Sequence, residues 1–461
     1  MLNSTIEELK QILYPLKVFE DYEIRLKNSL DASVEQNPEP IADVVIFPEN
    51  IKNIQDITVF ANEHKIPIIC RGAGTNTVGA CKPLNGGIII NMSKMNKILD
   101  INKENMTARV QAGVIVGDLQ KEAEKFGLYY PPDPSNLAVS TIGGSIAQNS
   151  AGARTFKYGS TKDYILSLTV VSANGKILKT GFETIKNSTG YNLSSVFVGS
   201  EGTLGIVVDA TVKLIVKPET SKVIMAYFDT LDDMSKAVSS VIAEHLTPAT
   251  IDFMDKNAIL AVEKHKPTGL LTDKEAMLLI EVDGAETSVE IDTAKVVKLL
   301  ENCKASKIEY SKNPQDAERI WFARRSSMIA CKELKPNVST DDLIVPRQNL
   351  TKLVQGVQKI CDKYNLTVCM VGHIGDGSVH PQIPIDLSDK DEYNRLKQAK
   401  EEFYDLTTEL SGTISGEHGI GCEKREYLTK ILDKNAIEYM KQIKKIFDPN
   451  NILNPNKIWI E

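Results

Sequence analysis

Three glycine-rich segments in the first half of the chain most constrain its fold. They span residues 71–79, 140–152 and 199–207, and their glycines do not suit the interior of a helix or strand. The first segment follows an apolar run, and loops of this type can point successive backbone N–H groups inward to bind an anion such as a pyrophosphate. It is neither a G-x-G-x-x-G fingerprint nor a P-loop. Taken singly, each segment is more often a structural turn.

The organisation of the chain predicts more than one domain. With 461 residues it is too long for one ordinary core, and two or three domains are expected. Short hairpins alternate with helices up to about residue 216. After Pro218 glycine becomes sparse, and amphipathic helices alternate with strands. This pattern predicts an α+β fold and not a run of βαβ units.

Apolar periodicity predicts the individual elements. A capping-box pattern at residues 4–7 predicts the start of a short helix. Asn174-Gly175 lies between two apolar runs, 168–171 and 176–178, and predicts a hairpin. The other expected elements of the first half are strands at 44–47, 66–70 and 87–90, a hairpin over 96–112, and helices at 50–64 and 117–126. Those of the second half are strands at 225–228, 277–280 and 343–345, helices at 231–245, 292–304, 314–334 and 350–364, and a helix after 420.

Composition and charge narrow the class of protein. The chain is 42% hydrophobic and 25% charged, as in soluble globular proteins, and its net charge of −7 gives no support for binding nucleic acid or an anionic membrane. The N-terminal residues carry Glu7 and Glu8 and do not resemble a signal peptide, and no run of 18 apolar residues predicts a membrane span. We therefore expect a cytoplasmic protein.

Cysteine usage agrees with a reducing compartment. The seven cysteines are odd in number and form no C-x-x-C pair. The same pattern argues against an iron–sulfur cluster in this chain. If electrons move through the protein, they must leave by another protein or a small acceptor.

Two histidines and a glutamate predict a metal site. His373 follows the apolar run 366–371, which predicts a strand, and the Gly375-Asp376-Gly377 turn should bring His380 back beside it on a neighbouring strand. Glu417 would come from a separate Gly-flanked loop. Two imidazoles and a carboxylate form a ligand set that Zn, Fe or Mn accepts, with positions left open. The alternative is that glycine-rich loops hold hydrogen-bonded histidines and an exposed glutamate without a chemical role.

The order of the motifs resembles a known family of flavoproteins. The first glycine-rich loop is followed by Pro131-Pro132-Asp133-Pro134, Thr141-Ile142-Gly143-Gly144, Tyr158-Gly159 and Gly199-Ser200-Glu201-Gly202-Thr203-Leu204-Gly205. This order is similar to the FAD-binding domain of the vanillyl-alcohol oxidase type. The later His-x-Gly-Asp-Gly and Gly-Glu-His-Gly segments resemble the branch with D-lactate dehydrogenase, the flavin subunit of glycolate oxidase and D-2-hydroxyglutarate dehydrogenase. The resemblance covers about residues 38–458.

The resemblance implies a fold class and a domain plan. The fold is an α+β architecture with a vanillyl-alcohol oxidase-type (PCMH-type) FAD-binding domain of two α/β subdomains, plus an α+β cap domain with an antiparallel sheet. The implied domains are an N-terminal helical arm (1–37), the FAD-binding domain (38–217), a cap domain carrying the substrate and metal site (218–419), and a C-terminal segment that returns to the FAD domain (420–461).

The resemblance also implies the residues that bind FAD. The phosphates fall on the first loop, which has no His or Cys for a covalent flavin link, so FAD should be dissociable. Three positions depart from the family pattern: Ser145, Ala151 and Asn456 stand where relatives have Asn, Gly and Gly. The implied residues are Arg71, Gly72, Ala73, Gly74, Thr75, Asn76, Thr77, Pro132, Asp133, Ser140, Thr141, Gly143, Gly144, Asn149, Gly152, Tyr158, Gly159, Glu201, Gly205, Ile206 and Asn454.

For the chemistry, the resemblance implies His373, His380 and Glu417 as metal ligands. His418 matches the family's active-site histidine and is expected to act as general base, with a role as an orienting hydrogen-bond partner of a ligand as the alternative. Arg324 matches the arginine that binds the substrate carboxylate. Arg325 is its competitor, because adjacent helical residues lie about 100° apart, and a solvated helix face is the alternative for both. Ser378 replaces the usual Asn after Gly-Asp-Gly.

The function implied is a dehydrogenase that uses FAD and a divalent metal. It would oxidise a small D-2-hydroxy acid, with D-lactate ahead of glycolate, by hydride transfer to flavin N5. Electrons would pass to an electron-transferring flavoprotein or an iron–sulfur subunit, and a homodimer is left open. The alternatives are a glycolate oxidase flavin subunit, a D-2-hydroxyglutarate dehydrogenase, a non-catalytic flavin subunit, and, from a different class, a metal-dependent hydrolase.

Overall fold

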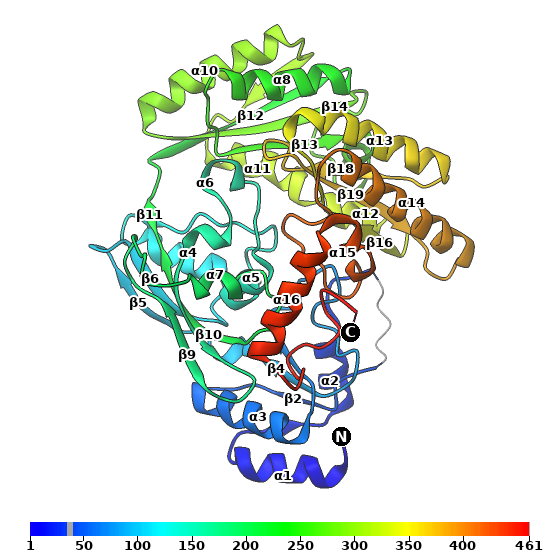
Figure 1. Ribbon diagram of the computed structural model, residues 1–461. Helices are drawn as coiled ribbons and strands as arrows, with labels where there is room; N and C mark the ends of the chain where they lie inside the picture. The colour runs from blue at the N-terminus through cyan, green and yellow to red at the C-terminus, as the bar shows by residue number, and fades with distance from the viewer. Residues whose placement is uncertain (35–39, 461) are drawn as a thin grey trace. The chain divides into compact units, whose positions relative to one another are not determined.

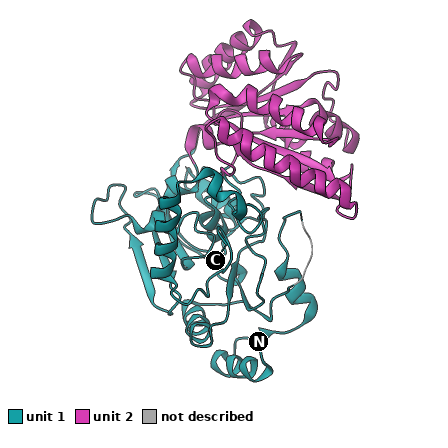
Figure 2. Ribbon diagram, turned by 45° about the vertical axis from the view of Figure 1, so that its right-hand side comes forward, with its two compact units in different colours: residues 1–151, 160–217, 417–461 teal, residues 152–159, 218–416 magenta. Residues whose placement is uncertain are grey.

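The chain forms two compact units in its computed structural model, which describes residues 1–34 and 40–460 (Figures 1 and 2). Unit 1 comprises Met1–Ala151, Ser160–Lys217 and Glu417–Glu461, and unit 2 comprises Gly152–Gly159 and Pro218–Gly416. The expected boundary between residues 37 and 38 lies outside the described residues. The four-domain plan stays a prediction. Among the described residues, none of the helices combines the length and the apolar character needed to cross a bilayer.

The first sheet of unit 1 is mixed, with the strand order β1-β2-β4-β3. β2, β4 and β3 run parallel, and β1 pairs antiparallel with β2. The expected alternation of hairpins and helices did not predict these parallel pairs. α1 and α3 bury apolar side chains in the same core as this sheet. The elements are α1 (Asn3–Leu13), β1 (Val18–Phe19), α2 (Tyr22–Ser29), β2 (Val44–Ile46), α3 (Ile51–His64), β3 (Ile68–Arg71) and β4 (Ile88–Asn91).

The second sheet of unit 1 is antiparallel throughout, with the order β5-β6-β10-β8-β9. The expected Asn174-Gly175 hairpin is confirmed: β8 pairs with β9, and Gly175 has a φ of +76°. α4, α5 and α7 contribute side chains to the core against this sheet. The elements are β5 (Ile98–Asn102), β6 (Thr107–Gln111), α4 (Val116–Glu124), β7 (Leu128–Tyr129), α5 (Ile142–Gln148), β8 (Ile165–Val171), β9 (Ile177–Gly181), α7 (Leu193–Phe197), β10 (Ile206–Lys213) and β11 (Ile215–Val216).

Unit 2 is built on one large antiparallel sheet, whose order is β15-β12-β14-β13-β18-β19-β16, with β17 paired to β19. Helices cover both faces of β12 and β14, so nearly every residue of β14 is buried. The elements are α6 (Thr155–Tyr158), β12 (Thr220–Phe228), α8 (Leu231–Ala243), β13 (Thr250–Asp255), α9 (Lys256–His265), β14 (Ala276–Gly284), α10 (Glu286–Asn302), β15 (Lys307–Tyr310), α11 (Pro314–Arg325), α12 (Ser327–Lys332), β16 (Asn337–Thr340), β17 (Leu343–Ile344), α13 (Leu350–Lys363), β18 (Cys369–Gly372), β19 (Ser378–Ile385) and α14 (Lys390–Glu409).

The hairpin β18–β19 positions the two histidines of the predicted metal site. His373 follows the last residue of β18, and His380 lies in β19 opposite Val371. The reversal requires glycine at Gly377, where φ is +92° and a Cβ would lie 2.2 Å from the Val345 carbonyl oxygen. The expected return of His380 beside His373 on a neighbouring strand is therefore confirmed.

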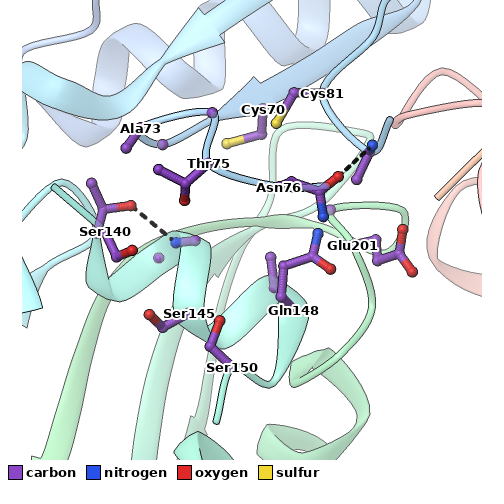
Figure 3. Close-up of a pocket in the computed structure, with 18 of the residues that line it drawn as sticks. Cys70, Ala73, Thr75, Asn76, Cys81, Ser140, Ser145, Gln148, Ser150 and Glu201 are labelled. Atoms are coloured by element: carbon purple, nitrogen blue, oxygen red, sulfur yellow. Dashed lines mark hydrogen bonds between the residues drawn. The ribbon is translucent and has the colours of Figure 1, made fainter. Parts of the chain in front are cut away.

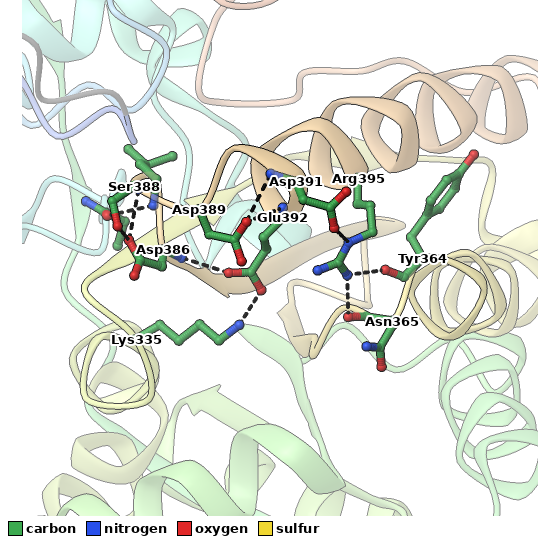
Figure 4. A network of polar contacts seen from close by, with 11 residues as sticks. Lys335, Tyr364, Asn365, Asp386, Ser388, Asp389, Asp391, Glu392 and Arg395 are labelled. Carbon is green, nitrogen blue, oxygen red and sulfur yellow. Dashed lines mark hydrogen bonds and ion pairs between the residues drawn. The ribbon is translucent and has the colours of Figure 1, made fainter.

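A polar network fixes the end of β19 against the start of α14 (Figure 4). The Asp389 carboxylate caps α14 by accepting the N–H groups of Asp391 at 3.0 Å and Glu392 at 3.1 Å. Glu392 accepts the N–H of Asp386 at 3.1 Å and pairs with Lys335. Because Glu392 is buried, these bonds replace hydration of its carboxylate, and they hold the strand that carries His380.

Two local expectations were wrong. The first helix begins at Asn3 with Leu2 as its N-cap and no side-chain capping bond, so the pattern at residues 4–7 lies inside the helix and is not a capping box. The helix expected over 314–334 is two helices, α11 and α12, which meet at Ser326.

The C-terminal helix α16 (Lys434–Phe447) is fastened to unit 1 by a buried lysine. The Lys444 ammonium donates to the carbonyl oxygens of Thr203 at 2.9 Å and Leu453 at 2.8 Å and pairs with Asp448. The Asp448 carboxylate in turn accepts the N–H groups of Ile452 and Leu453.

Replacing this lysine should destabilise the protein. Lys444→Met leaves the buried Asp448 carboxylate without its cation and is expected to lower the free energy of unfolding by about 3 kcal/mol. Chemical denaturation measures the effect. Lys445→Met is the control, because Lys445 is exposed on the same helix. Equal stability of the two variants would contradict this account.

Candidate active site

A cavity in unit 1 gathers most of the residues expected to bind a cofactor (Figure 3). Thr75 and Asn76 of the first glycine-rich loop face it from one side, and Ser145 and Gln148 of α5 face it from the other. Its lining includes, of the expected residues, Gly72, Ala73, Gly74, Thr75, Asn76, Thr77, Ser140, Thr141, Gly143, Gly144, Glu201 and Gly205, together with Glu417 and His418.

The first loop follows β3 and comes very close to the start of α5. A Cβ on Gly72 would lie 2.3 Å from the Thr141 hydroxyl oxygen, so only glycine permits this approach. Thr141 is the N-cap of α5, and its hydroxyl accepts the Gly144 N–H at 3.1 Å. The cavity wall here consists of backbone and small polar groups, which suits the phosphates and ribose of a dinucleotide.

Arg71 is not among the residues that line the cavity, and its side chain contacts the N-terminal part of the chain. Its guanidinium donates to the carbonyl oxygens of Asn28, at 2.9 Å, and of Leu30. A Cβ on Gly74 would lie 2.0 Å from this guanidinium, which shows how tightly the loop folds over the side chain. The Arg71 side chain thus links the loop to the N-terminal residues. Its binding to a phosphate stays a prediction.

Several expected cofactor residues do not line the cavity itself. Asn454 lies beneath it, where its amide donates to the carbonyl oxygens of Ala80 at 3.0 Å and Glu201 at 2.7 Å. Asn149 ends α5 with a φ of +49°. Their roles toward FAD stay predictions, as do those of the remaining residues outside the lining, Pro132, Asp133, Gly152, Tyr158, Gly159 and Ile206.

Tyr158 and Gly159 belong to a short segment that packs within unit 2. The Tyr158 hydroxyl donates to the Asp283 carboxylate at 2.7 Å, and Lys157 donates to the Asp283 carbonyl oxygen at 3.0 Å. Arg154 of the same segment pairs with Glu281 at 2.9 Å. The segment is therefore held on β14 by charged contacts that its sequence pattern alone did not predict.

Sequence reasoning missed other residues that line the cavity. Cys70 and Cys81 face it beside the first loop (Figure 3). Burial raises the pKa of Cys70 to about 12 and that of Cys81 to about 11, so both thiols stay protonated near neutral pH. Cys70 ends an apolar run and Cys81 follows the loop, and no local pattern separates such cysteines from ordinary core residues.

Glu201 holds the loop that carries Glu417 and His418. Its buried carboxylate accepts the N–H groups of Ile420 at 2.7 Å and Gly421 at 2.8 Å. Burial raises the pKa of Glu201 to about 7, although these two bonds to its carboxylate oppose the rise. A Cβ on Gly419 would lie 2.8 Å from the same carboxylate, so the loop passes directly over it.

His418 is fixed at the edge of the cavity by its own backbone. Its carbonyl oxygen accepts from the Asn76 amide at 3.1 Å, and its Nε2 lies 4.0 Å from the Glu417 carboxylate. The imidazole lines the cavity together with the Glu417 side chain. A titratable group is thereby placed where a proton could be exchanged with a molecule in the cavity.

The expected metal ligands lie together. His373, His380 and Glu417 each offer one ligand atom, and these atoms all lie within 4.8 Å of one another. The ligand atoms of a divalent ion lie about 2.1 Å from the ion and roughly 3–4 Å from one another. Small side-chain movements would therefore bring these three atoms to the distances that an ion requires. Glu417 is joined by one peptide bond to Gly416, whose N–H donates to Asp342 of unit 2 at 2.7 Å.

A buried carboxylate lies near the Nδ1 atom of each histidine. Nδ1 of His373 lies 3.4 Å from Asp252, and Nδ1 of His380 lies 3.6 Å from Asp342. Both aspartates are at most 1% exposed. A carboxylate on the far nitrogen of a histidine is the usual neighbour of a metal-binding imidazole, so the residues present fit a divalent ion. Sequence reasoning missed both aspartates, although an Asp in the apolar strand β13 is an unusual placement.

Arg324 points into unit 2, and Arg325 points away. Arg324 is 9% exposed and its Nε lies 2.9 Å from the Asp252 carboxylate. Burial alone raises the pKa of Asp252, but the charges of Arg324 and His373 outweigh it and the pKa is lowered. Arg325 pairs with Glu318, and its side chain is 46% exposed. Of the two arginines, Arg324 is therefore the one that shares Asp252 with His373. Helix geometry predicted only that one of the two would point inward, and the resemblance implied Arg324.

Two protein-family models match most of the chain. Residues 217–458 match the model described as FAD linked oxidases, C-terminal domain, and residues 42–181 match the FAD binding domain.

Characterised relatives cover almost the whole chain. It is 42% identical over 453 residues to the glycolate oxidase subunit GlcD of Bacillus subtilis, covering 98% of this chain and 96% of that protein. It is 33% identical to the D-lactate dehydrogenase of Anaerostipes hadrus, and the match covers 90% of this chain and 89% of that protein. It is 30% identical to the D-2-hydroxyglutarate dehydrogenase of Stutzerimonas stutzeri, covering 99% of each.

Solved structures share the fold. p-Cresol methylhydroxylase with substrate bound gives a TM-score of 0.83 at 15% identity, over 99% of this chain and 97% of that one. 4-Ethylphenol oxidase from Gulosibacter chungangensis gives a TM-score of 0.80 at 17% identity, over 100% of this chain and 98% of that one. The expected α+β, PCMH-type architecture is confirmed.

The raised pKa of Glu201 predicts a pH-dependent stability. The folded protein binds this proton more tightly than the unfolded chain, whose glutamates have a pKa near 4.5. The resulting stability is fully present below pH 4.5 and is lost as the pH rises through 7. Between pH 5 and 8.5 the free energy of unfolding of the wild type should fall by about 2–3 kcal/mol more than that of Glu201→Gln, which has no carboxyl group to titrate at this position. Urea unfolding at both pH values tests this, and parallel losses in the two proteins would contradict it.

Proposed function

The chain belongs to the family of FAD-linked oxidases, and from this membership we propose that it oxidises a short 2-hydroxy acid to the 2-oxo acid with dissociable FAD and a divalent metal ion. FAD would occupy the cavity of unit 1. His373, His380 and Glu417 would hold the ion, whether Fe, Zn or Mn. In this proposal the FAD-binding body is built mainly from residues 38–217 and the cap from 218–419.

One observation carries the proposal: two adjacent residues connect the cavity and the ligand set. Glu417 belongs to the three possible ligands, and His418, the next residue, lines the cavity. Oxidising a hydroxy acid requires its hydroxyl to meet a base and its α-carbon to meet the flavin. A loop that supplies both a metal ligand and a base at neighbouring positions suits that reaction.

The two cofactors would supply distinct chemistry. When bound, FAD would accept the α-hydrogen of the substrate with its electron pair, and a divalent ion would lower the pKa of the substrate hydroxyl. The side chains of the protein would accept the hydroxyl proton and hold the loop that carries the base. His418 would accept the hydroxyl proton at Nε2, the ring nitrogen that faces Glu417. The Asn76 amide holds the carbonyl group of His418, and the Glu201 carboxylate holds the N–H of Ile420, two residues further along the loop.

The substrate would be small and anionic. Arg324 is the buried cation next to the histidine pair, and one edge of its guanidinium is directed at Asp252. The rest of the guanidinium remains suited to a carboxylate. D-lactate is the substrate expected from the sequence. Glycolate is the second candidate, favoured by the 42% identity to a glycolate oxidase subunit. D-2-hydroxyglutarate is the third, because one relative acts on it by name.

The electron acceptor would be a separate protein. The chain has no C-x-x-C pair to hold a cluster of its own. We propose an electron-transferring flavoprotein or an iron–sulfur subunit as partner and a cytoplasmic location, and we leave a homodimer of the chain open.

Anaerobic flavin reduction tests the proposed reaction. A panel of D- and L-2-hydroxy acids is added to the purified flavoprotein, and the flavin absorbance is followed before and after dialysis against a chelator. D-lactate or glycolate should bleach the flavin, and both chelation and His373→Ala should abolish bleaching. If no hydroxy acid bleaches the flavin, as a hydrolase would behave, the proposed function fails.

The role of Arg324 is tested by the steady-state KM for the acid. Arg324→Lys keeps the charge but loses the fork that grips a carboxylate, so KM should rise about 10–100-fold. Arg325→Lys, on the exposed side of the same helix, should leave KM unchanged. An equal rise in both variants would mean that the helix, and not the Arg324 side chain, is what matters.

A further inference from the structure

Asp342 contacts one of the three proposed metal ligands, His380, and also Gly416, the residue that precedes another of them. It lies between β16 and β17 and its side chain is fully buried. One carboxylate oxygen lies 3.6 Å from Nδ1 of His380, which is longer than a direct hydrogen bond but on the side of the ring away from Nε2. A carboxylate in this place favours the tautomer that carries its proton on Nδ1 and leaves Nε2 as the ligand atom.

The other oxygen of Asp342 holds the residue before Glu417. It accepts the N–H of Gly416 at 2.7 Å, and the Ser415 hydroxyl lies 3.4 Å away. The approach is close, because a Cβ on Gly416 would lie 1.8 Å from the end of the Ile344 side chain, which would have to shift. The Glu417 backbone therefore starts from a point that this carboxylate fixes.

The neighbouring residue, Asp341, contacts helix α14. The Asp341 carboxylate accepts the Tyr404 hydroxyl at 2.6 Å and pairs with Lys400 at 3.4 Å, and both partners lie on α14. Asp341 is as deeply buried as Asp342, at 1% exposure. The two adjacent aspartates thus share burial and charge but differ in what they contact.

We propose that Asp342 is the positioning residue of the metal site: by orienting His380 and anchoring the backbone before Glu417, it sets the arrangement that binds the ion. Asp252 lies at a similar distance from His373 but also pairs with Arg324, whereas Asp342 contacts both His380 and the backbone next to Glu417. The inference rests on the proposed metal dependence and deepens it.

Zinc affinity of matched variants tests the inference. The full chain with its flavin is freed of divalent metal, and Zn²⁺ is titrated in competition with a chromophoric chelator. Asn in place of Asp342 has one acceptor oxygen instead of two and cannot serve both His380 and Gly416. Asp342→Asn should therefore raise the Kd for Zn²⁺ about 10–100-fold, and Asp341→Asn should leave it unchanged. The unfolding midpoints of the metal-free proteins are measured in parallel.

The outcomes separate this inference from the function on which it rests. If the wild type binds neither Zn²⁺ nor, in the same competition assay, Fe²⁺ or Mn²⁺, both fail. If the wild type binds one of these ions and Asp342→Asn binds it equally well, only the role of Asp342 is overturned. Equal weakening by both aspartate variants, in step with lower midpoints, also overturns it, because the effect is then general destabilisation.

A second measurement needs no variant. Nitrogen-15 NMR of labelled histidine in the metal-free wild type reports which ring nitrogen of His380 carries the proton. The position of Asp342 predicts the Nδ1-protonated tautomer, and an Nε2-protonated ring would overturn the inference even if Asp342→Asn failed to fold.

Discussion

Two buried carboxylates hold the short loop that carries Glu417 and His418. Asp342 accepts the N–H of Gly416, and Glu201 accepts the N–H groups of Ile420 and Gly421. Glu417 and His418 lie between these anchors. Because a buried carboxylate loses its hydration, it must be satisfied by such donors, and the donors are then strongly held. The loop is thereby fixed near both ends, which a loop of small residues could not achieve by packing alone.

Residues of this loop belong to two sets. Glu417 and His418 line a cavity walled by backbone and small residues, which in the proposed function holds FAD. Glu417 is also one of three possible metal ligands, the others being two histidines of one hairpin, each with a buried carboxylate near Nδ1. In the proposed function, a ligand and a base on consecutive residues would leave little freedom in how a substrate is presented. The glycine-rich loops would then hold the oxidant, and the histidine hairpin would hold the group that binds the substrate.

Local patterns predicted the parts of this arrangement that local interactions decide. The Asn174-Gly175 turn and the return of His380 beside His373 are set by a few neighbouring residues. The parallel pairing of β2, β4 and β3 was not predicted, because it depends on strands that are distant in sequence. Arg71 was expected at a phosphate because of its motif, yet its side chain is directed to the carbonyl oxygens of Asn28 and Leu30. Nothing in the run Thr340-Asp341-Asp342 distinguishes the carboxylate that faces His380 from the one that faces Tyr404, because only tertiary packing separates them.

The central claim is that one loop brings a metal ligand to the histidine pair and a base to the flavin cavity. Anomalous X-ray diffraction from crystals of the protein with its flavin, recorded at the absorption edges of Fe, Zn and Mn, tests it most directly. The account predicts a single peak among His373, His380 and Glu417, with flavin density against the loop of residues 72–77. Full flavin density with no peak among the three side chains at any edge would contradict it.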